Sequence, residues 1–195
     1  MGSSRTPSNR SGRLVGVFCA SSDRIADSYA ATAAELGREL AARGDGLIYG
    51  GGNTGLMGHV ARAMHAAGGR VVGYIPARLM SIEGRAFDIA DELVVTESMH
   101  ERKVGIFERA DAFVILPGGI GTLEEFLEIV TLRHLGYHHK PIVLLDDDGF
   151  YRTLVRFLDE TVERGFSPPL GRLFHVTSSV SEALSWLDDR LPAGP

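Results

Sequence analysis

Nine consecutive residues, Pro117 to Glu125, combine three glycines, a threonine hydroxyl and two carboxylates directly after an apolar run. The order Pro-Gly-Gly-Ile-Gly-Thr-Leu-Glu-Glu behind Ala112–Leu116 predicts a strand, a glycine turn and the start of a helix. Glycines let a ligand approach the backbone closely, and the first N–H groups of a helix attract an anion. The segment is therefore a candidate phosphate site with a carboxylate one turn away, which indicates a nucleotide held for chemistry.

The two carboxylates of this segment cannot share one role. Adjacent helix residues point about 100° apart, so Glu124 and Glu125 cannot both face one ligand atom. Thr122 and Glu125 also fit a capping box, in which Glu125 would bond back to the N–H of Thr122. The local pattern leaves Glu125 with two interpretations, a helix cap or a reacting carboxylate.

A second glycine-rich segment, residues 50–55, follows the predicted strand Gly46–Tyr49 and satisfies the pattern G-x-G-x-x-G. A dinucleotide site also needs an acidic residue about 20 positions further on, but no carboxylate ends the next strand. Arg78 stands there instead and would accept the 2′-phosphate of NADP. Gly51 and Gly52 either give their backbone to a ligand or pack the strand against the helix.

A third charged group opens a predicted helix after the fourth strand, with the sequence Met99-His100-Glu101-Arg102-Lys103. Two cations near a helix start oppose its dipole, at roughly a few tenths of a kcal/mol each, unless an anion binds there. Arg102 and Lys103 are therefore candidates for an anion clamp, and a solvated charged face is the alternative. Ser21 and Ser22, after the first strand, are candidate hydrogen-bond donors to a ligand.

Composition fits one globular domain: 195 residues, 44% hydrophobic, with a formal net charge of -5. The acidic balance argues against a nucleic-acid surface, and no apolar run approaches the roughly 18 residues that span a membrane. The single cysteine, Cys19, indicates a reducing compartment, so we expect a cytoplasmic protein. Because His134, His138 and His139 lack partner ligands for a metal, we expect them at the surface.

Short apolar runs alternate with longer helical patterns, which predicts a single-domain α/β fold, a doubly wound (Rossmann-like) parallel sheet with helices on both faces. We expect a domain over residues 13–191 with a lid at 76–91. We also expect a disordered N-terminal tail at 1–12 and a C-terminal tail at 192–195. The expected strands are Leu14–Cys19, Gly46–Tyr49, Arg70–Ile75, Glu92–Val95, Ala112–Leu116, Pro141–Leu145 and Phe174–Val176. The expected helices are Asp27–Arg43, Leu56–Ala67, Met99–Ala110, Thr122–Leu135, Tyr151–Arg164 and Ser181–Arg190.

Several spaced motifs together resemble the Lonely Guy (LOG) family of cytokinin riboside 5′-monophosphate phosphoribohydrolases, once widely mislabelled as lysine decarboxylases. Residues 117–125 match the family motif PGGxGTxxE, and the likeness extends over nearly the whole chain after the tail. The chain departs from the commonest forms at Asn53-Thr54 and in the segment 80–83. Further matching segments are FCASS at 18–22, YGGG at 49–52, GLMG at 55–58, MHERK at 99–103 and LGYHHKP at 135–141.

The resemblance implies hydrolysis of the N-glycosidic bond between an N6-modified adenine and ribose 5-phosphate, with AMP as a poorer substrate and no cofactor or metal. Arg102 and Glu125 would be the catalytic pair, and Glu125 would stabilise positive charge on the sugar and orient or deprotonate water. The resemblance also implies a homodimer in which each pocket is built partly from the neighbouring subunit. The substrate-binding residues would be Glu83, Met99, Arg102, Lys103, Gly118, Gly119, Ile120, Gly121, Thr122, Leu123, Glu124 and Thr131, with Gly51, Gly52 and Ser21.

Two other functions compete with hydrolysis. A catalytically silent nucleotide sensor or carrier would use the same loops, although simple phosphate binding does not need a carboxylate beside the anion. Amino-acid decarboxylation is the other, and the sequence lacks a recognisable pyridoxal-lysine context for it.

Overall fold

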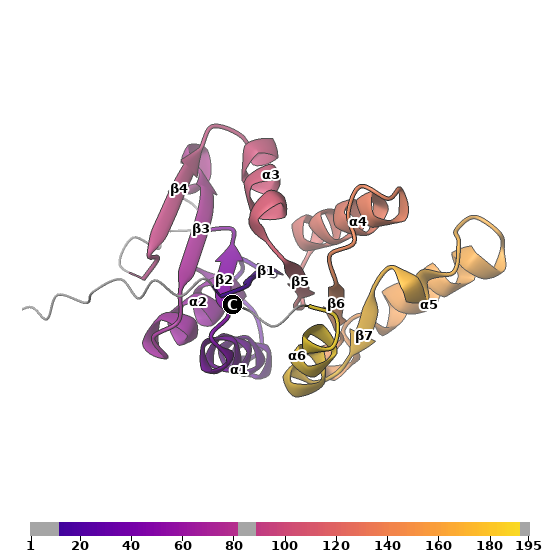
Figure 1. Cartoon of the computed structure of the whole chain (residues 1–195), viewed down its shortest axis with the longest axis horizontal. Helices are drawn as coiled ribbons and strands as arrows, with labels where there is room; N and C mark the ends of the chain where they lie inside the picture. The colour runs from indigo at the N-terminus through magenta and orange to yellow at the C-terminus, as the bar shows by residue number, and fades with distance from the viewer. Residues whose placement is uncertain (1–11, 82–88, 192–195) are drawn as a thin grey trace, which may run out of the picture.

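The computed structural model describes residues 12–81 and 89–191 of the chain. Among them a seven-stranded parallel sheet has the order β4-β3-β2-β1-β5-β6-β7 (Figure 1). The strands are β1 Leu14–Phe18, β2 Gly46–Tyr49, β3 Val71–Pro76, β4 Glu92–Thr96, β5 Ala112–Ile115, β6 Ile142–Leu145 and β7 His175–Thr177. The helices are α1 Asp27–Arg43, α2 Gly55–Ala66, α3 Met99–Arg109, α4 Ile120–His134, α5 Arg152–Glu163 and α6 Val180–Asp188. Short 3₁₀ helices are η1 Ala77–Leu79, η2 Asp147–Gly149 and η3 Leu170–Arg172.

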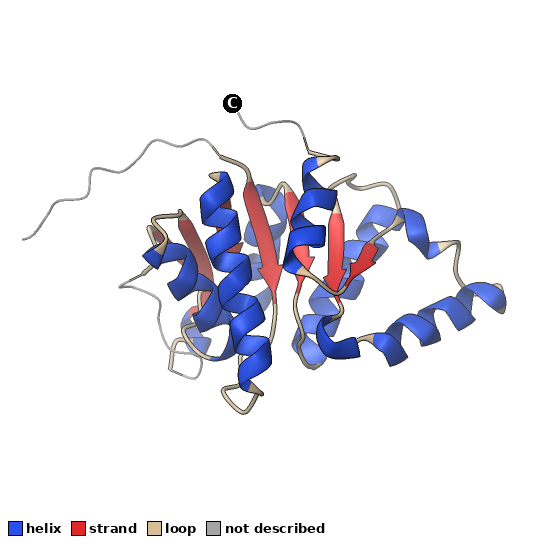
Figure 2. Cartoon of the chain, turned by 90° about the horizontal axis from the view of Figure 1, so that it is seen from below, coloured by secondary structure: helices blue, strands red, loops and turns tan. Residues whose placement is uncertain are grey.

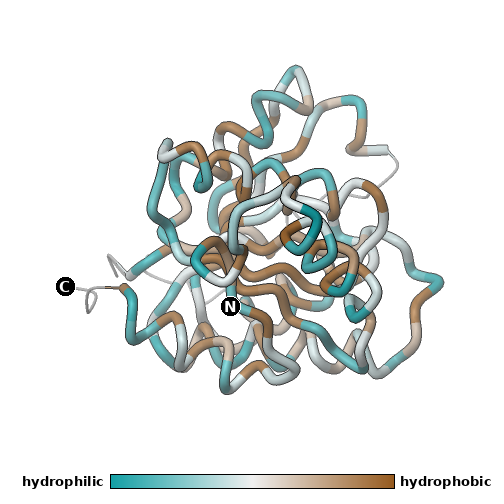
Figure 3. The backbone as a smooth tube through the Cα atoms, turned by 90° about the vertical axis from the view of Figure 1, so that its right-hand side faces the viewer, coloured by the Kyte–Doolittle hydropathy of each residue, from teal (hydrophilic) through white to brown (hydrophobic). Residues whose placement is uncertain are grey.

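Helices cover both faces of the sheet, as Figure 2 shows. On one face α1, α2 and α6 pack against strand residues such as Val15 and Val114. On the other face α3, α4 and α5 pack against residues such as Phe18 and Phe113. Successive strand residues are therefore all apolar, because each one meets a helix on one side or the other. Figure 3 shows the resulting hydrophobic centre within a more polar periphery, and the predicted doubly wound fold is confirmed.

The predicted elements are present with ends shifted by one or two residues, and the shift at α4 changes the interpretation of its carboxylates. This helix begins at Ile120, with Gly119 as its N-cap and no side-chain hydrogen bond at the cap. Thr122 lies inside the first turn, buried against Gly118, where an added Cβ would lie 2.1 Å from the Thr122 hydroxyl oxygen. The interpretation in which Thr122 is the N-cap of this helix, as a capping box with Glu125 requires, is therefore wrong.

The strand order reverses between β1 and β5, and this reversal places the functional site. The chain steps from β1 to β4 towards one edge of the sheet, and from β5 to β7 towards the other. Connections that leave β1 and β5 lead to helices on opposite faces, which opens a crevice at the carboxyl ends of these strands. One hydrogen bond, from the Ala20 N–H to the Pro117 carbonyl oxygen at 3.1 Å, joins the two connections.

Two predicted regions fall partly outside the described residues. Of the expected lid at 76–91, residues 76–79 form the end of β3 and the 3₁₀ helix η1, whereas 82–88 lie outside the described residues, as do residues 1–11 and 192–195. No helix of the described part is long and apolar enough to cross a membrane.

The segment 135–141 ties α3 to α4 at the edge of the sheet opposite the crevice. Lys140 donates through Nζ to the carbonyl oxygens of Phe107 at 2.5 Å and Glu108 at 3.2 Å, in the last turn of α3. Its ammonium group also lies 4.8 Å from the centroid of the Phe107 ring. A cation at the carboxyl end of a helix is favourable, so Lys140 stabilises this end of α3.

His138 in the same segment is buried, so its predicted surface position is wrong. Its Nε2 lies 2.8 Å from the carbonyl oxygen of Ile129 in α4, and its Nδ1 accepts from the Lys140 N–H at 3.1 Å. The ring also packs edge-on against Phe107 and Phe113. Both ring nitrogens find backbone partners, which allows a histidine to be buried without a metal.

Protonation of His138 should weaken the fold at mildly acidic pH. Burial lowers the pKa of His138 below its ordinary value of 6.5, and the nearby cations Arg133 and Lys140 act in the same direction. The folded state prefers the neutral ring, so this contribution to stability is complete above about pH 6.5 and is lost as the pH falls below it. We expect the thermal unfolding temperature of the wild type to fall between about pH 7.5 and 5.5.

The variant His138→Gln should lose about 1–3 kcal/mol of unfolding free energy at neutral pH, because the buried partners of the ring lose a hydrogen bond. Its unfolding temperature should therefore be lower than that of the wild type and should depend less on pH over this range. His139 is the exposed neighbour of His138, so His139→Gln is the matched control. This control should retain the wild-type pH dependence of the unfolding temperature. Thermal unfolding followed by circular dichroism measures both; equal pH slopes in His138→Gln and the wild type would contradict the assignment.

Candidate active site

A cleft of about 330 Å³ lies at the carboxyl ends of β1, β2 and β5. The end of β1, the residues after it and the first turn of α4 line this cleft. Arg102 and Met99 reach it from α3, Met57 from α2, and Leu79 from η1. The cleft therefore lies at the point where the strand order reverses, which is the usual ligand position in open α/β sheets.

The start of α4 offers this cleft an anion-binding end. Ile120, Gly121 and Thr122 line the cleft, and the first N–H groups of a helix have no partner within the helix. A Cβ added at Gly119 or Gly121 would meet no atom within 4 Å. Packing within the chain does not require glycine at these two positions, so the space beside the backbone is open to a ligand. With the positive end of the helix dipole, this geometry suits a phosphate.

The start of α2, by contrast, is closed by the chain itself. The Gly55 N–H donates to Oδ1 of Asp23 at 2.7 Å, and the Leu56 N–H donates to the Ala20 carbonyl oxygen at 2.9 Å. Gly55 has φ +56°, and a Cβ there would lie 2.5 Å from the carbonyl carbon of Ser21. The glycine pattern of residues 50–55 therefore serves close packing at this helix start, and the NADP alternative loses its phosphate site.

Arg102 brings a buried cation into the cleft. Its side chain is 5% exposed, and it passes so close to Gly50 that a Cβ there would lie 1.8 Å from Nη2. Nη1 and Nη2 lie 3.7 Å from the sulfur atoms of Met99 and Met57, respectively. Gly50 is required because the guanidinium occupies the space of its missing side chain.

The start of α3 is stabilised by its own sequence. The Ser98 hydroxyl accepts from the Glu101 N–H at 3.1 Å, and the Glu101 carboxylate accepts from the Glu97 N–H at 3.0 Å. This arrangement resembles a capping box and places a carboxylate in the first turn, where it offsets the charges of Arg102 and Lys103. The helix therefore starts at a fixed residue, which fixes the direction in which Arg102 leaves it.

Lys103 leaves α3 in a different direction and does not line the cleft among the described residues. Its Nζ lies 2.5 Å from Oε1 of Glu124 and 3.0 Å from Oε2 of Glu128, both in α4. Burial acts to lower the pKa of Lys103, but hydrogen bonds to the two carboxylates outweigh it and raise the pKa above its ordinary value. The two cations predicted as one clamp thus have different partners.

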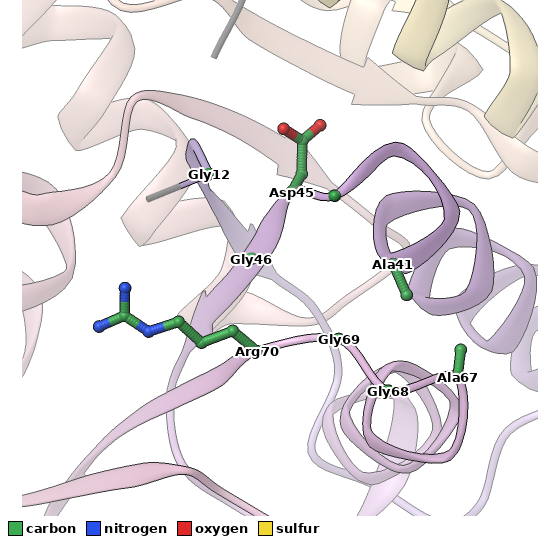
Figure 4. A pocket seen from close by; sticks show the side chains of 9 residues that line it. Gly12, Ala41, Asp45, Gly46, Ala67, Gly68, Gly69 and Arg70 are labelled. Atoms are coloured by element: carbon green, nitrogen blue, oxygen red, sulfur yellow. The ribbon is translucent and has the colours of Figure 1, made fainter. Parts of the chain in front are cut away.

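A second hollow, of about 200 Å³, lies at the opposite edge of the sheet (Figure 4). Glycine and alanine dominate its lining, and Figure 4 shows the side chains of Asp45 and Arg70 pointing in different directions. Arg13 binds both oxygens of Asp45, at 2.8 and 2.9 Å, and Arg70 lies 3.6 Å from Glu92. The charged groups are engaged elsewhere, so this hollow offers mainly backbone.

Relatives with similar sequences are named for action on cytokinin riboside 5′-monophosphates. A family model described as "possible lysine decarboxylase" matches residues 57–187. The probable cytokinin riboside 5′-monophosphate phosphoribohydrolase LOGL5 of Oryza sativa subsp. japonica is 44% identical over 181 residues, 92% of this chain and 73% of the relative. The chain belongs to the LOG family. A further LOG relative, the cytokinin riboside 5′-monophosphate phosphoribohydrolase LOG3 of Arabidopsis thaliana, is 44% identical over 88% of this chain and 80% of its own length.

Solved structures share the LOG-family fold at lower identity. The molybdenum cofactor binding protein of Rippkaea orientalis has a TM-score of 0.71 and 21% identity, covering 91% of this chain and 96% of that chain. The molybdenum cofactor carrier protein of Chlamydomonas reinhardtii has a TM-score of 0.70 and 24% identity, covering 92% and 99%. At these identities the likeness shows the doubly wound fold alone.

The structure brings together part of the residue set that the LOG resemblance implies. Glu125, partly buried, and Glu124, 53% exposed, line the cleft with Arg102. Ser21 and Met99 line it as well. The predicted catalytic pair, Arg102 and Glu125, therefore shares one cleft with the helix start that suits a phosphate; the roles of both stay predictions.

Other members of the LOG-implied set lie elsewhere in the described part of the chain. Leu123 and Thr131 face an outer strip of α4, where the Thr131 hydroxyl donates to the Leu127 carbonyl oxygen at 2.7 Å. Gly51 and Gly52 are buried, and neither is among the described residues that line the cleft. Gly118 packs against Thr122, as described above, and Glu83 lies outside the described residues.

Seven of the described residues that line the cleft were not among the predicted site residues: Val17, Phe18, Cys19 and Ala20 at the end of β1, and Gly50, Met57 and Leu79. Gly50 belongs to a run of three glycines, and the sequence gives no sign of which one a distant arginine crosses. Met57 lies in the GLMG segment that the LOG resemblance included, which was the available signal. Leu79 comes from a 3₁₀ helix that periodicity cannot reveal in three residues.

Proposed function

We propose that this LOG-family chain hydrolyses the N-glycosidic bond of a nucleoside 5′-monophosphate with an N6-modified adenine, releasing the free base and ribose 5-phosphate. The observation that carries the proposal is one cleft that joins the open start of α4, the buried Arg102 and the Glu125 carboxylate. Relatives named for this activity, 44% identical over most of the chain, support it.

In this proposal the phosphate binds at the start of α4. The glycine backbone at 119 and 121 leaves room for it, and the N–H groups of the first turn donate to its oxygens. Ser21 and Ser22 line the same cleft and add hydroxyl donors. Arg102 contributes a cation that is preorganised by burial, so little reorganisation is needed when the nucleotide binds.

The base binds where apolar side chains line the cleft, next to the guanidinium of Arg102. Met57, Leu79 and Met99 supply apolar lining there, and two of them are methionines, whose flexible side chains adapt to ligands of different shape. An adenine with an apolar N6 substituent removes this surface from water. The same wall gives AMP less contact, which is consistent with AMP as a poorer substrate.

The chemistry assigned to Glu125 follows from the charge that develops in the reaction. As the C–N bond breaks, its electron pair goes to the base and positive charge builds on the ribose. Glu125 lies three residues, about 4.5 Å of helix rise, beyond Thr122, so its carboxylate stands near a sugar whose phosphate binds the helix start. The carboxylate stabilises this charge and takes a proton from the water whose oxygen bonds to the anomeric carbon; the base gains a proton from solvent.

Lysine decarboxylation, the activity in the family model's description, fits the chain poorly. A pyridoxal cofactor needs a lysine for its Schiff base, and the sequence has two lysines, Lys103 and Lys140. Lys103 is held by two carboxylates, and Lys140 donates to carbonyl oxygens at the end of α3, far along the helix from the cleft. Neither is among the described residues that line the cleft.

We expect purified protein to release free base and ribose 5-phosphate from N6-isopentenyladenosine 5′-monophosphate, more slowly from AMP, and negligibly from the unphosphorylated nucleoside. Loss of the phosphate removes the anchor at α4, which positions the sugar. Chromatography of the products measures the release. Tight nucleotide binding without release would instead make the chain a silent sensor or carrier.

Glu125→Gln should lower turnover by about 100-fold or more, because the amide can neither accept the proton nor stabilise the developing charge. Nucleotide binding, measured by calorimetry, should remain near the wild-type value. Glu163→Gln, at the exposed end of α5, is the matched control. Near-normal turnover in Glu125→Gln would show that this carboxylate is structural.

We also propose that the protein is a homodimer, with a cytoplasmic location supported by its single cysteine. The outer face of α4 carries an apolar strip that is open to solvent. Ile120 and Glu124 belong both to this strip and to the cleft, so a second copy seated on the strip would also cover the cleft mouth. Thr131, which lies on the strip, would then reach the partner's site. The strip comprises Ile120, Leu123, Glu124, Leu127, Glu128, Thr131 and Leu132.

Leu127→Glu should convert the dimer to a monomer, because it places a charge in the middle of the proposed apolar contact. Light scattering after size-exclusion chromatography gives the mass. Phe166→Glu, an equally polar change at a residue that is 83% exposed beyond α5, is the control. A dimer mass that survives Leu127→Glu would place the interface elsewhere.

A further inference from the structure

The ion pairs of Lys103 assign it a role other than holding phosphate. We propose that Lys103 is a positioning residue, which fixes the start of α4 against α3 and thereby sets the separation of Arg102 and Glu125. The proposal rests on the function proposed above, because it concerns the geometry of the same site. Lys103 acts on the reaction through Glu124 and Glu128, without touching the substrate.

The first support is the way in which neighbouring residues divide their tasks. Arg102 and Lys103 are adjacent in α3, and Glu124 and Glu125 are adjacent in α4. Arg102 and Glu125 line the cleft, whereas Lys103 lies on Glu124 and Glu128 at 2.5 and 3.0 Å. Arg102 and Glu125 thus each stand beside a residue that joins the two helices, and Glu124 both lines the cleft and binds Lys103. A shift between the helices would move both pairs together.

The second support is the position of α3 and α4 in the fold. They cover the same face of the sheet, but α3 packs over β1 to β4, while α4 follows β5 on the far side of the strand reversal. At the edge away from the cleft, Lys140 and His138 join the two helices through segment 135–141. At the cleft end Lys103 supplies a direct link between them. The two helices are therefore held at both ends.

The third support is burial. The Lys103 side chain is 16% exposed, so its long stem is packed and its ammonium is held in one place. Glu124 and Glu128 are 53% and 39% exposed, which screens the charges and limits their effect on overall stability. Geometry is more sensitive than stability, since a displacement of about 1 Å in a reacting group can cost on the order of 100-fold in rate.

The test compares the kcat and KM of three variants with those of the wild type. Lys103→Met keeps the apolar stem and removes the charge, Glu128→Gln removes one partner outside the cleft, and Lys103→Met with Glu128→Gln removes both. If Lys103 positions the site, Lys103→Met should lower kcat by about 10–100-fold with little change in KM. Glu128→Gln should lower kcat in the same way but less, and the double variant should be no worse than Lys103→Met.

A phosphate-binding role predicts a different pattern, which would overturn the proposal. Lys103→Met would then raise KM for the nucleotide monophosphate, and Glu128→Gln would leave kcat unchanged. The exchanged pair Lys103→Glu with Glu128→Lys adds a further check, because it restores attraction between the helices while removing the cation from position 103. Recovery of kcat above that of Lys103→Glu alone supports positioning, and no recovery contradicts it.

Crystal structures of the wild type and Lys103→Met separate this proposal from the function on which it rests. A displaced α4 start, with a changed separation of Arg102 and Glu125, supports positioning whether or not the protein turns over a nucleotide. An unmoved α4 start overturns the positioning role. Absence of base release by the wild type overturns the hydrolase assignment, and leaves the structural comparison to decide the role of Lys103.

Discussion

The reversal of strand order between β1 and β5 is the constraint from which the rest of this structure follows. Parallel strands need helices on both faces, and the chain can place them only by winding outward from this point in two directions. The connection after β1 goes to α1 on one face, and that after β5 goes to α4 on the other. The cleft forms where they part, so it brings together residues from distant segments of the chain, such as Ser21 after β1 and Arg102 in α3.

The electrostatic potential of the cleft depends on which of the nearby charged side chains are paired with each other and which face the cleft. The chain as a whole carries a formal net charge of -5, yet it places an arginine and an open helix start at one point. Arg102 is buried beside two methionine sulfur atoms, whereas Lys103, one residue further, is neutralised by carboxylates of α4. A local positive site in an acidic protein can attract a small anion without attracting nucleic acid.

Local sequence rules predicted the elements well and their side-chain partners poorly. Runs such as Phe113-Val114-Ile115 reveal buried strands because both faces of a parallel sheet are covered. The capping pattern at Thr122 misled because Gly119 and Gly121 let the helix begin two residues earlier, and no propensity rule distinguishes the two starts. His138 and Lys103 escaped prediction because their partners, Ile129 and the α4 carboxylates, are supplied by tertiary packing. The PGGxGTxxE motif, in contrast, predicted the position of the cleft, since a glycine turn after a parallel strand must fall at the carboxyl edge.

Asp23 occupies the start of α2 with a negative charge that belongs to the chain itself. Its carboxylate binds the Gly55 N–H at 2.7 Å, at a helix start whose glycine pattern otherwise matches that of coenzyme-binding proteins. A diphosphate-bridged molecule that reached from α4 towards α2 would bring its second phosphate against this fixed negative charge. The N–H that a coenzyme phosphate would use at this helix start is already bound to a carboxylate of the chain itself.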